Sequence, residues 1–324
     1  MPSIWQRQPR YFIFVALLIL ASILAFNPYH STLRTDSYTA YLRDHDLPAR
    51  LQRSEHVYSR VIANRKEMIQ KYGPTPKDIL MFPPDKEPWP AYTVWNFFPP
   101  SFHCPHELER IGALGDGGKW ACGMSRLEHK HKCLIYTFGM NYETSFEAEL
   151  LERTRYCEVW GYDYRSNSFG SDIKSNPRAN FFSYGLANID AHGPHDEHQL
   201  YTLKSLLEMN GHDHIDVLKI DIEGWEFEVL TQILQPYVAS GEPLPFGQLI
   251  LEIHTWEKGF EEFLPWWEML EAAGLRPFMM EVNLVYQNYN RGHGTDLAEY
   301  SFINIKGDNI FIQDPPIASD ADVV

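Results

Sequence analysis

The stretch VLKIDIEGWE at residues 217–226 carries the strongest information about the fold of this chain. It begins with a short, mainly apolar β-rich run, which is typical of a strand buried on both faces of a parallel sheet. Asp221 and Glu223 follow this run, and their equal parity points both side chains the same way in an extended chain. Ligands of open α/β sheets collect beyond the carboxyl ends of the strands. We therefore expect the functional site at this strand end.

Strand-like and helix-like patterns alternate along the chain from residue 133 onward. Predicted strands cover residues 133–138, 158–162, 179–184, 217–221, 248–254, 282–286 and 300–305. Predicted helices cover residues 144–155, which open with a T-x-x-E capping box, and residues 200–209, 225–234 (ending before a proline) and 261–273. This alternation predicts an α/β fold with a mostly parallel sheet and helices on both faces.

Length and charge limit the classes of protein to be considered. The 324 residues suit one large domain with appendages or two modest domains, and a hydrophobic content of 44% is ample for a core. The net charge of -15 argues against a nucleic-acid partner, because binding to phosphates requires a basic face.

The amino-terminal segment predicts a membrane anchor. Residues 11–26 are apolar and follow Arg7 and Arg10, so an uncleaved signal anchor would leave the amino terminus in the cytoplasm and the rest in the Golgi or ER lumen. A cleaved signal peptide is the alternative, since the run is shorter than the roughly 20 residues of a typical span. The expected parts are a cytoplasmic tail (residues 1–10), the anchor (11–26) and a stem with a proline- and aromatic-rich strap (27–100). The catalytic domain (101–313) and a second tail (314–324) follow.

The four cysteines leave two possibilities open. Cys104 and Cys122 are candidates for a disulfide in an oxidising compartment. Cys133 and Cys157 fit buried small hydrophobic residues of strands at least equally well. The chain has no C-x-x-C spacing, so we expect no zinc site.

The first strand and its loop limit the choice of cofactor. The loop contains Gly139 alone, without the G-x-G-x-x-G or G-x-x-x-x-G-K-[ST] patterns that bind phosphates. Asp163 ends the next strand, roughly 20 residues on, where an acid holds ribose hydroxyls. Ribose recognition without a phosphate site indicates a nucleoside-type cofactor such as S-adenosylmethionine. The alternative for Asp163 is an ordinary loop acid that caps a helix or a turn.

Two longer motifs resemble a known family. Residues 218–226, LKIDIEGWE, resemble the K-I-D-x-E-G-x-E signature of FkbM-like S-adenosylmethionine-dependent methyltransferases. Residues 110–120, RIGALGDGGKW, are similar to the opening motif of a membrane-anchored eukaryotic methyltransferase-like branch. The resemblance covers residues 102–312. It implies a Rossmann-like class I methyltransferase fold with a seven-stranded sheet whose last strand is antiparallel.

The resemblance also implies a position for each part of S-adenosylmethionine. Gly139 and its loop, which includes Asn141 and follows Phe138, would face the methionine part. Asp163 would take the ribose hydroxyls, and residues 183–186, with Tyr184 and Gly185, would lie by the adenine. Tyr164 is a further expected cofactor contact. Asp221 would lie beside the transferred methyl group. The single glycine departs from the usual multi-glycine loop of methyltransferases. Asp116, inside the glycine-rich residues 115–118, is a further candidate ligand contact.

Methyl transfer to a hydroxyl group benefits from a base near its proton. The candidates are Asp221, Glu223 and His254, the last at the end of the next strand. The alternative for the two carboxylates is structural, with Glu223 or Glu226 capping the following helix. Oxygen and imidazole ligands at these positions suit several metal ions, but we expect no metal here. The acceptor, whether glycan, lipid, protein or small molecule, is not indicated.

Two other functions remain open. A membrane-anchored glycosyltransferase has the same layout of anchor, stem and catalytic domain, but it normally requires a D-x-D pair, to which residues 221–223 come close without matching. The second possibility is a methyltransferase-like domain that has lost turnover and acts as a binding module.

Overall fold

The computed structural model describes residues 17, 44–88, 91–289 and 295–314. Residues Asp46–Gln313 form one compact unit, and the few other described residues belong to a separate unit. The predicted anchor and both predicted tails lie outside the described residues, except for Leu17 and Asp314. None of the helices in the described ranges is long and apolar enough to cross a membrane.

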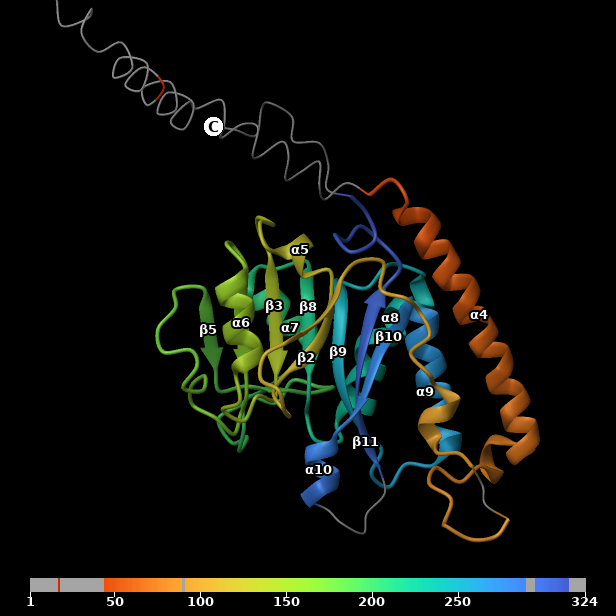
Figure 1. Ribbon diagram of the computed structural model, residues 1–324. Helices are drawn as coiled ribbons and strands as arrows, with labels where there is room; N and C mark the ends of the chain where they lie inside the picture. Colours follow the sequence, from red (N-terminus) through yellow and green to blue (C-terminus); the bar gives the residue numbers. More distant parts are fainter. Residues whose placement is uncertain (1–16, 18–43, 89–90, 290–294, 315–324) are drawn as a thin grey trace, which may run out of the picture. The chain divides into compact units, whose positions relative to one another are not determined.

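A seven-stranded sheet forms the centre of the compact unit, with the strand order β10-β11-β9-β8-β3-β4-β5 (Figure 1). The strands are β3 (Leu134–Phe138), β4 (Glu158–Tyr162), β5 (Ala179–Phe182), β8 (Ile215–Ile220), β9 (Phe246–His254), β10 (Leu275–Val282) and β11 (Leu297–Asn304). β11 is antiparallel to both of its neighbours, and β9, β8, β3, β4 and β5 pair in parallel. The predicted Rossmann-like methyltransferase fold, with its last strand antiparallel, is confirmed.

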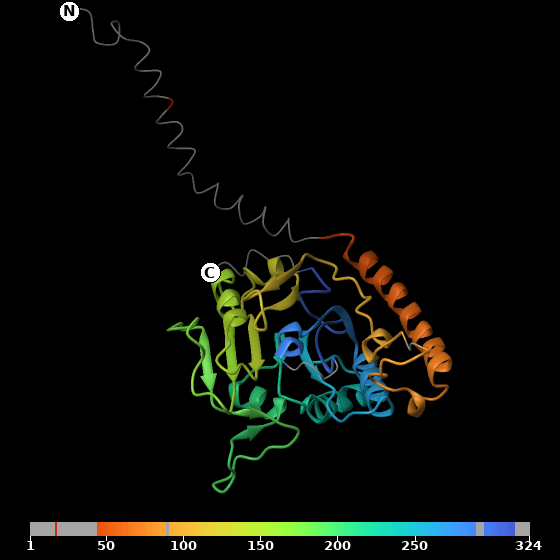
Figure 2. The same ribbon diagram turned by 60° about the horizontal axis from the view of Figure 1, so that its bottom comes forward.

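Side chains on both faces of the sheet are covered, as the apolar strand patterns predict. Every residue of β8 and β9 is buried. One face packs against α7 (Leu203–Asn210), α8 (Glu226–Ser240) and α9 (Phe260–Ala273). The other face packs against α5 (Met124–Leu127), α6 (Ser145–Arg153) and the hairpin of β1 (Leu108–Ile111) and β2 (Lys119–Cys122). Figures 1 and 2 show these layers from two directions.

The compact unit begins earlier in the chain than the catalytic domain expected from residue 101. The helix α4 (Leu47–Tyr72) lies along α9 (Figure 1), where Arg65 forms an ion pair of 2.7 Å with Glu271. The strap includes the short 3-10 helices η1 (Pro76–Asp78) and η2 (Val94–Phe97), and Val94 and Phe97 are buried in the core. The compact unit therefore includes residues from Asp46 onward that the sequence-based division places in the stem and strap.

Three local predictions are wrong. The strand predicted at 282–286 is instead the end of β10 followed by the short helix α10 (Leu284–Tyr289). The helix predicted to end before Pro236 continues to Ser240, with Pro236 on its exposed side. The predicted capping box of α6 does not form: Thr144 makes no side-chain cap, and the Glu147 carboxylate pairs with Lys219.

Both pairs of cysteines form disulfides, so all four cysteines of the chain are paired. The bridge from Cys104 to Cys122 was one of the sequence-based candidates. The bridge from Cys133 to Cys157 corrects their interpretation as buried thiols. These two residues directly precede β3 and β4, whose parallel register starts both strands side by side and leaves the Cα atoms 4.3 Å apart.

Candidate active site

A cavity of about 480 Å³ opens at the carboxyl ends of β3, β4 and β8. Its size lies within the range of about 300–1,000 Å³ that small-molecule sites occupy. The walls are the loops after these strands, the β1–β2 turn and the segment between β6 (Gly185–Leu186) and β7 (Leu200–Tyr201). Ten predicted site residues line the cavity: Asp116, Phe138, Gly139, Asn141, Asp163, Tyr164, Tyr184, Gly185, Asp221 and Glu223. His254 is not among the lining residues.

Gly139 brings the β3 loop into contact with the strand end at Asp221. Its φ of +74° is unfavourable for other residues, and a Cβ atom at this position would overlap the carbonyl oxygen of Asp221. The backbone N–H of Asp221 donates to the Phe138 carbonyl at 3.1 Å, and the N–H of Gly139 donates to the Tyr162 carbonyl at 3.1 Å. A single glycine therefore suffices to let the β3 loop close over Asp221.

Asp163 is buried, and both of its carboxylate oxygens already accept hydrogen bonds. The backbone N–H groups of Asn141 and Arg165 donate at 2.7 and 2.8 Å, and the Ser166 hydroxyl donates at 3.2 Å. A carboxylate has about four acceptor positions, so about one remains for a ligand. Asp163 thus ties the β3 and β4 loops together, and contact with a ribose stays a prediction.

The turn after Asp221 is stabilised by Glu226 rather than by Glu223. Glu226 is fully buried, and its carboxylate accepts from the backbone N–H groups of Ile222 and Gly224 at 3.1 Å each. Glu223 has a positive φ of +57°, and its side chain is 54% exposed at the cavity. Of the two acids considered for a structural role, Glu226 stabilises the turn, and Glu223 faces the cavity.

His254 is bound to Glu226 and is a poor proton acceptor. Its Nδ1 lies 3.0 Å from Glu226 Oε1, and its Nε2 lies 3.9 Å from both Glu223 and Glu252. Burial lowers the pKa of His254, but the hydrogen bond and the charge of Glu226, together with the charges of Asp221 and Glu252, outweigh this and raise the pKa to about 9. His254 is therefore protonated at neutral pH, which argues against its predicted role as a base.

Asp221 differs from Asp163 and Glu226, because its carboxylate does not already accept hydrogen bonds. Within the described part of the chain, its side chain has no hydrogen-bond partner. Burial raises its pKa well above the usual range, the charge of Glu252 adds to this, and Lys119, Lys219 and His254 oppose it. Asp221 is thus a half-buried carboxyl group that faces the cavity.

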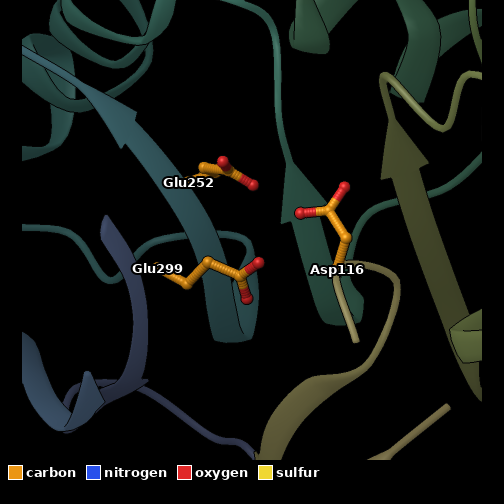
Figure 3. Close-up of side chains that lie close together, drawn as sticks. All are labelled: Asp116, Glu252 and Glu299. Carbon is orange, nitrogen blue, oxygen red and sulfur yellow. The ribbon is translucent and has the colours of Figure 1, made fainter. Parts of the chain in front are cut away.

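Behind Asp221 lies a cluster of carboxylates that includes its own cation. Figure 3 shows that Asp116 on the β1–β2 turn, Glu252 on β9 and Glu299 on β11 point toward one another, with oxygen atoms within 4.8 Å. The ammonium group of Lys119 hydrogen-bonds to Glu299, lies 3.7 Å from Glu252 and donates to the Asp116 carbonyl at 2.8 Å. Because a lysine already supplies the positive charge here, we assign no metal to the cluster.

Sequence reasoning missed both lysines of the cavity wall. Lys219 shares its parity with Asp221 on β8, and that signal was available. Its Nζ lies 3.3 Å from Glu147 of α6, and both side chains are buried. Lys119 had no such signal, because the β1–β2 hairpin reaches β9 and β11 only in the folded chain.

A second depression, of about 600 Å³, lies on the outer surface of α8 and α9. It is more open, and none of the predicted site residues lines it. Its walls are helix side chains such as Phe227, Thr231 and Trp266. We assign the active site to the cavity at the strand ends, where the loops and the charged groups converge.

The fold and the position of the cavity define a Rossmann-like methyltransferase. Residues 61–302 match the model of a family described as "Methyltransferase domain", and the chain belongs to that family. Human "Probable methyltransferase-like protein 24" is 31% identical over 140 residues, which cover 40% of this chain and 35% of that protein. The protein of the same name from Rattus norvegicus is 29% identical over 144 residues, which cover 43% and 38%. The match thus spans little more than a third of these relatives.

Two solved structures are similar at a low level. A Methanococcus jannaschii fibrillarin pre-rRNA processing protein has 12% identity and a TM-score of 0.35, over 61% of this chain and 71% of that chain. A putative rRNA-methylase from Clostridium thermocellum has 12% identity and a TM-score of 0.32, over 56% and 92%. Similarities this low add nothing to the strand order described above. The finer resemblance to the FkbM-like group stays a prediction.

Proposed function

We propose that the protein transfers a methyl group from S-adenosylmethionine to a hydroxyl group of its acceptor, with Asp221 as the base. The observation that carries this proposal is the Asp221 carboxyl, half-buried at the cavity and without a hydrogen-bond partner among the described residues, at the strand end that Gly139 closes. A carboxyl of this kind is available to accept a proton in the cavity.

The residues of the cavity fit the proposed cofactor. S-adenosylmethionine would supply an electrophilic methyl group on a positively charged sulfur. Gly139 and Gly185 leave room beside the β3 and β5 loops, where a side chain would meet Asp221 or Leu200. The aromatic ring of Tyr184 offers a flat face at the adenine position implied by the sequence. The surplus of carboxylates around Asp221 complements a positive charge.

The remaining side chains hold this arrangement in place. Glu226 and His254 fix the turn that follows Asp221, through the hydrogen bonds described above. Asp163 fixes the β3 loop against the β4 loop. Alignment of acceptor and methyl group can supply roughly 7–11 kcal/mol of a reaction barrier, so rigid strand ends are an advantage.

The location and acceptor belong to the same proposal. Two disulfides support an oxidising compartment such as the Golgi or ER lumen, entered through the predicted amino-terminal anchor in the membrane. Trp225 and Ile189 line the cavity and are 62% and 66% exposed, which supports an acceptor with an apolar portion. A glycan, lipid, protein or small molecule can meet this requirement, and the net charge disfavours nucleic acid.

Calorimetry tests the proposal with S-adenosylmethionine, S-adenosylhomocysteine and, with Mn²⁺, a nucleotide sugar. We expect the first two to bind and the sugar nucleotide not to bind. Binding of the nucleotide sugar alone would favour the glycosyltransferase. Binding of the cofactor without labelled product in any extract supplied with radioactive S-adenosylmethionine would favour the inactive binding module.

The base is tested with Asp221→Asn in the same labelling assay. Loss of a general base lowers turnover by about 10²–10⁴-fold. We expect a loss of that size, with a smaller loss of affinity for S-adenosylmethionine. Full activity of Asp221→Asn would exclude Asp221 as the base.

A further inference from the structure

Lys119 is buried where two segments of the sheet meet the β1–β2 hairpin. Only 4% of the residue is exposed, although it lies at the cavity wall. Its ammonium group contacts Glu299 on β11, Glu252 on β9 and the carbonyl of Asp116 in its own turn. A single side chain thus connects three elements behind the active site.

A second residue repeats these connections. The amide of Asn283, between β10 and α10, donates to Asp116 Oδ1 at 2.6 Å and to Glu252 Oε1 at 3.1 Å. Lys119 and Asn283 therefore hold Asp116 from both sides. The turn that carries Asp116 is fixed at the cavity by polar contacts, since its neighbour Leu114 is 98% exposed and packs on nothing.

The other cations around Asp221 already have carboxylate partners of their own. Lys219, on β8, pairs with Glu147, and His254, at the end of β9, pairs with Glu226. Among the described residues around Asp221, Lys119 is the cation that remains for the other acids. These acids are Glu252 on β9, Glu299 on β11, Asp116 in the β1–β2 turn and Glu223 in the turn after β8.

The pKa values of both partners of the closest ion pair, Lys119 and Glu299, are raised, which favours the charged form of the lysine and the neutral form of the glutamate. Burial lowers the pKa of Lys119, but Glu299, Glu252 and Asp221 together raise it above its ordinary value. Burial raises the pKa of Glu299 to about 7, opposed by Lys119 and reinforced by Glu252. Several carboxylates act on the single ammonium group of Lys119, whereas each carboxylate receives only a share of its charge.

We propose that Lys119 is a positioning residue of the methyl-transfer site: it holds the β1–β2 turn against β9 and β11 at the cavity wall and supplies positive charge that offsets the acids gathered beside Asp221. This inference rests on the proposed function, since it concerns the same cavity. It gives the G-D-G-G-K segment at residues 115–119 a role, because Lys119 binds the Asp116 carbonyl within this turn and a Cβ atom at Gly118 would overlap the Ala113 carbonyl.

The consequence is a binding preference that depends on pH. An ionised Asp221 attracts the positive sulfur of S-adenosylmethionine and has no such effect on the neutral sulfur of S-adenosylhomocysteine. The ratio of the two dissociation constants therefore reports the charge at this end of the cavity, because all other groups of the two ligands are shared. Without Lys119, the carboxylates take up a proton at higher pH, and the preference for S-adenosylmethionine is lost at higher pH.

The experiment measures both dissociation constants by calorimetry between pH 5.5 and 9, for the full chain and for Lys119→Met. An opposite charge within about 4–6 Å lowers the pKa of a carboxyl by about 1–3 units. We expect Lys119→Met to raise the midpoint of the pH dependence by about one unit or more. Lys119→Arg keeps the charge and should restore the midpoint, which a loss of packing alone would not explain.

Two matched variants complete the test. Lys130 pairs with Asp216 at 3.2 Å, near the opposite ends of the strands, so Lys130→Met should leave the midpoint unchanged. Glu299→Gln removes an acidic neighbour while retaining Lys119, and it should lower the midpoint. This second variant keeps the test decisive if Lys119→Met does not fold, as judged by its melting temperature.

The outcomes separate the two proposals. If the full chain binds neither ligand, the proposed function fails. If the full chain binds both ligands but Lys119→Met has the same midpoint, no pH dependence at all, or a uniformly tighter S-adenosylmethionine complex, then Lys119 does not position Asp221. The last result is what simple repulsion between Lys119 and the sulfonium would produce.

Discussion

Two buried ion clusters in the protein differ in how their charges are matched. Between α4 and α9, the Arg65 guanidinium forms two hydrogen bonds with Glu271, at 2.7 and 3.0 Å, and a third with the Phe97 carbonyl at 3.0 Å. Glu271 also accepts from the Tyr58 hydroxyl at 2.5 Å and from the Trp267 indole at 3.0 Å. One cation meets one carboxylate, and hydrogen bonds satisfy the remaining positions.

The cluster at the cavity has one lysine for several acids. Lys119 is shared by Glu252 and Glu299, and the unpartnered Asp221 lies within its electrostatic influence. Carboxylates that outnumber their cations raise the free energy of the folded state, because burial and mutual repulsion oppose ionisation. The difference indicates that the matched cluster serves the fold, whereas the unmatched one serves the site, where perturbed pKa values concentrate.

The largest effect is expected in the matched cluster. Arg65→Met leaves the Glu271 charge buried without its cation, and breaking such a pair lowers the free energy of unfolding by about 3–5 kcal/mol. Urea denaturation at pH 7 measures it. Arg60→Met, on the exposed side of the same helix, is the control and should change stability by no more than about 0.5 kcal/mol. Equal effects of the two variants would contradict a structural role for the Arg65 pair.

Glu226→Gln tests the pair that holds the turn after Asp221. The pKa of His254, about 9 in the folded protein, should fall, because the hydrogen bond and the charge of Glu226 are lost while burial still lowers the pKa and only the charges of Asp221 and Glu252 oppose it. NMR titration of the His254 ring measures this change. The raised pKa contributes on the order of 3 kcal/mol of stability, fully present below about pH 6.5 and lost as the pH rises through 9. A wild-type stability that stays constant over this pH interval would refute the assignment.

Gly139→Ala tests the close contact between the β3 loop and Asp221, and Gly211→Ala is its control. Both glycines have a similar positive φ, +74° and +71°, but a Cβ atom meets nothing within 4 Å at Gly211. The difference between the two variants isolates the overlap with Asp221, which we expect to lower the free energy of unfolding by a further amount of about 1–3 kcal/mol. Only Gly139→Ala should weaken binding of S-adenosylmethionine. Identical behaviour of the two would show that the contact has no role.

The smallest effect, and one of opposite sign, is expected for Glu299→Gln. The folded-state pKa of Glu299, about 7, exceeds the unfolded value, so ionisation of Glu299 removes stability as the pH rises from about 4.3 to 7. The glutamine variant lacks this loss and should be as stable as the wild type or more stable, by about 1 kcal/mol at pH 8. Denaturation at pH 5 and pH 8 provides the comparison. A loss as large as that of Arg65→Met would remove the distinction between the clusters.

The positions of the site loops could be predicted from local patterns. Buried strands appear as apolar runs, and the acids after them mark the carboxyl ends of the strands. This is why ten of the eleven predicted residues line one cavity. The errors arose where a distant partner decided the outcome. Glu147 fits a capping box by spacing, but it pairs with Lys219, 72 residues further along the chain.

The chain alone therefore determined the order of strands and helices, the α/β class and the strand ends that bear Asp163 and Asp221, because periodicity and turn residues act over short distances. The tertiary structure decided what each of these groups is bound to. It engages Asp163 with three donors, protonates His254 through Glu226 and sets Lys119 among acids from two other strands. Charges act through space and depend on burial, so their effect is fixed only when distant segments meet.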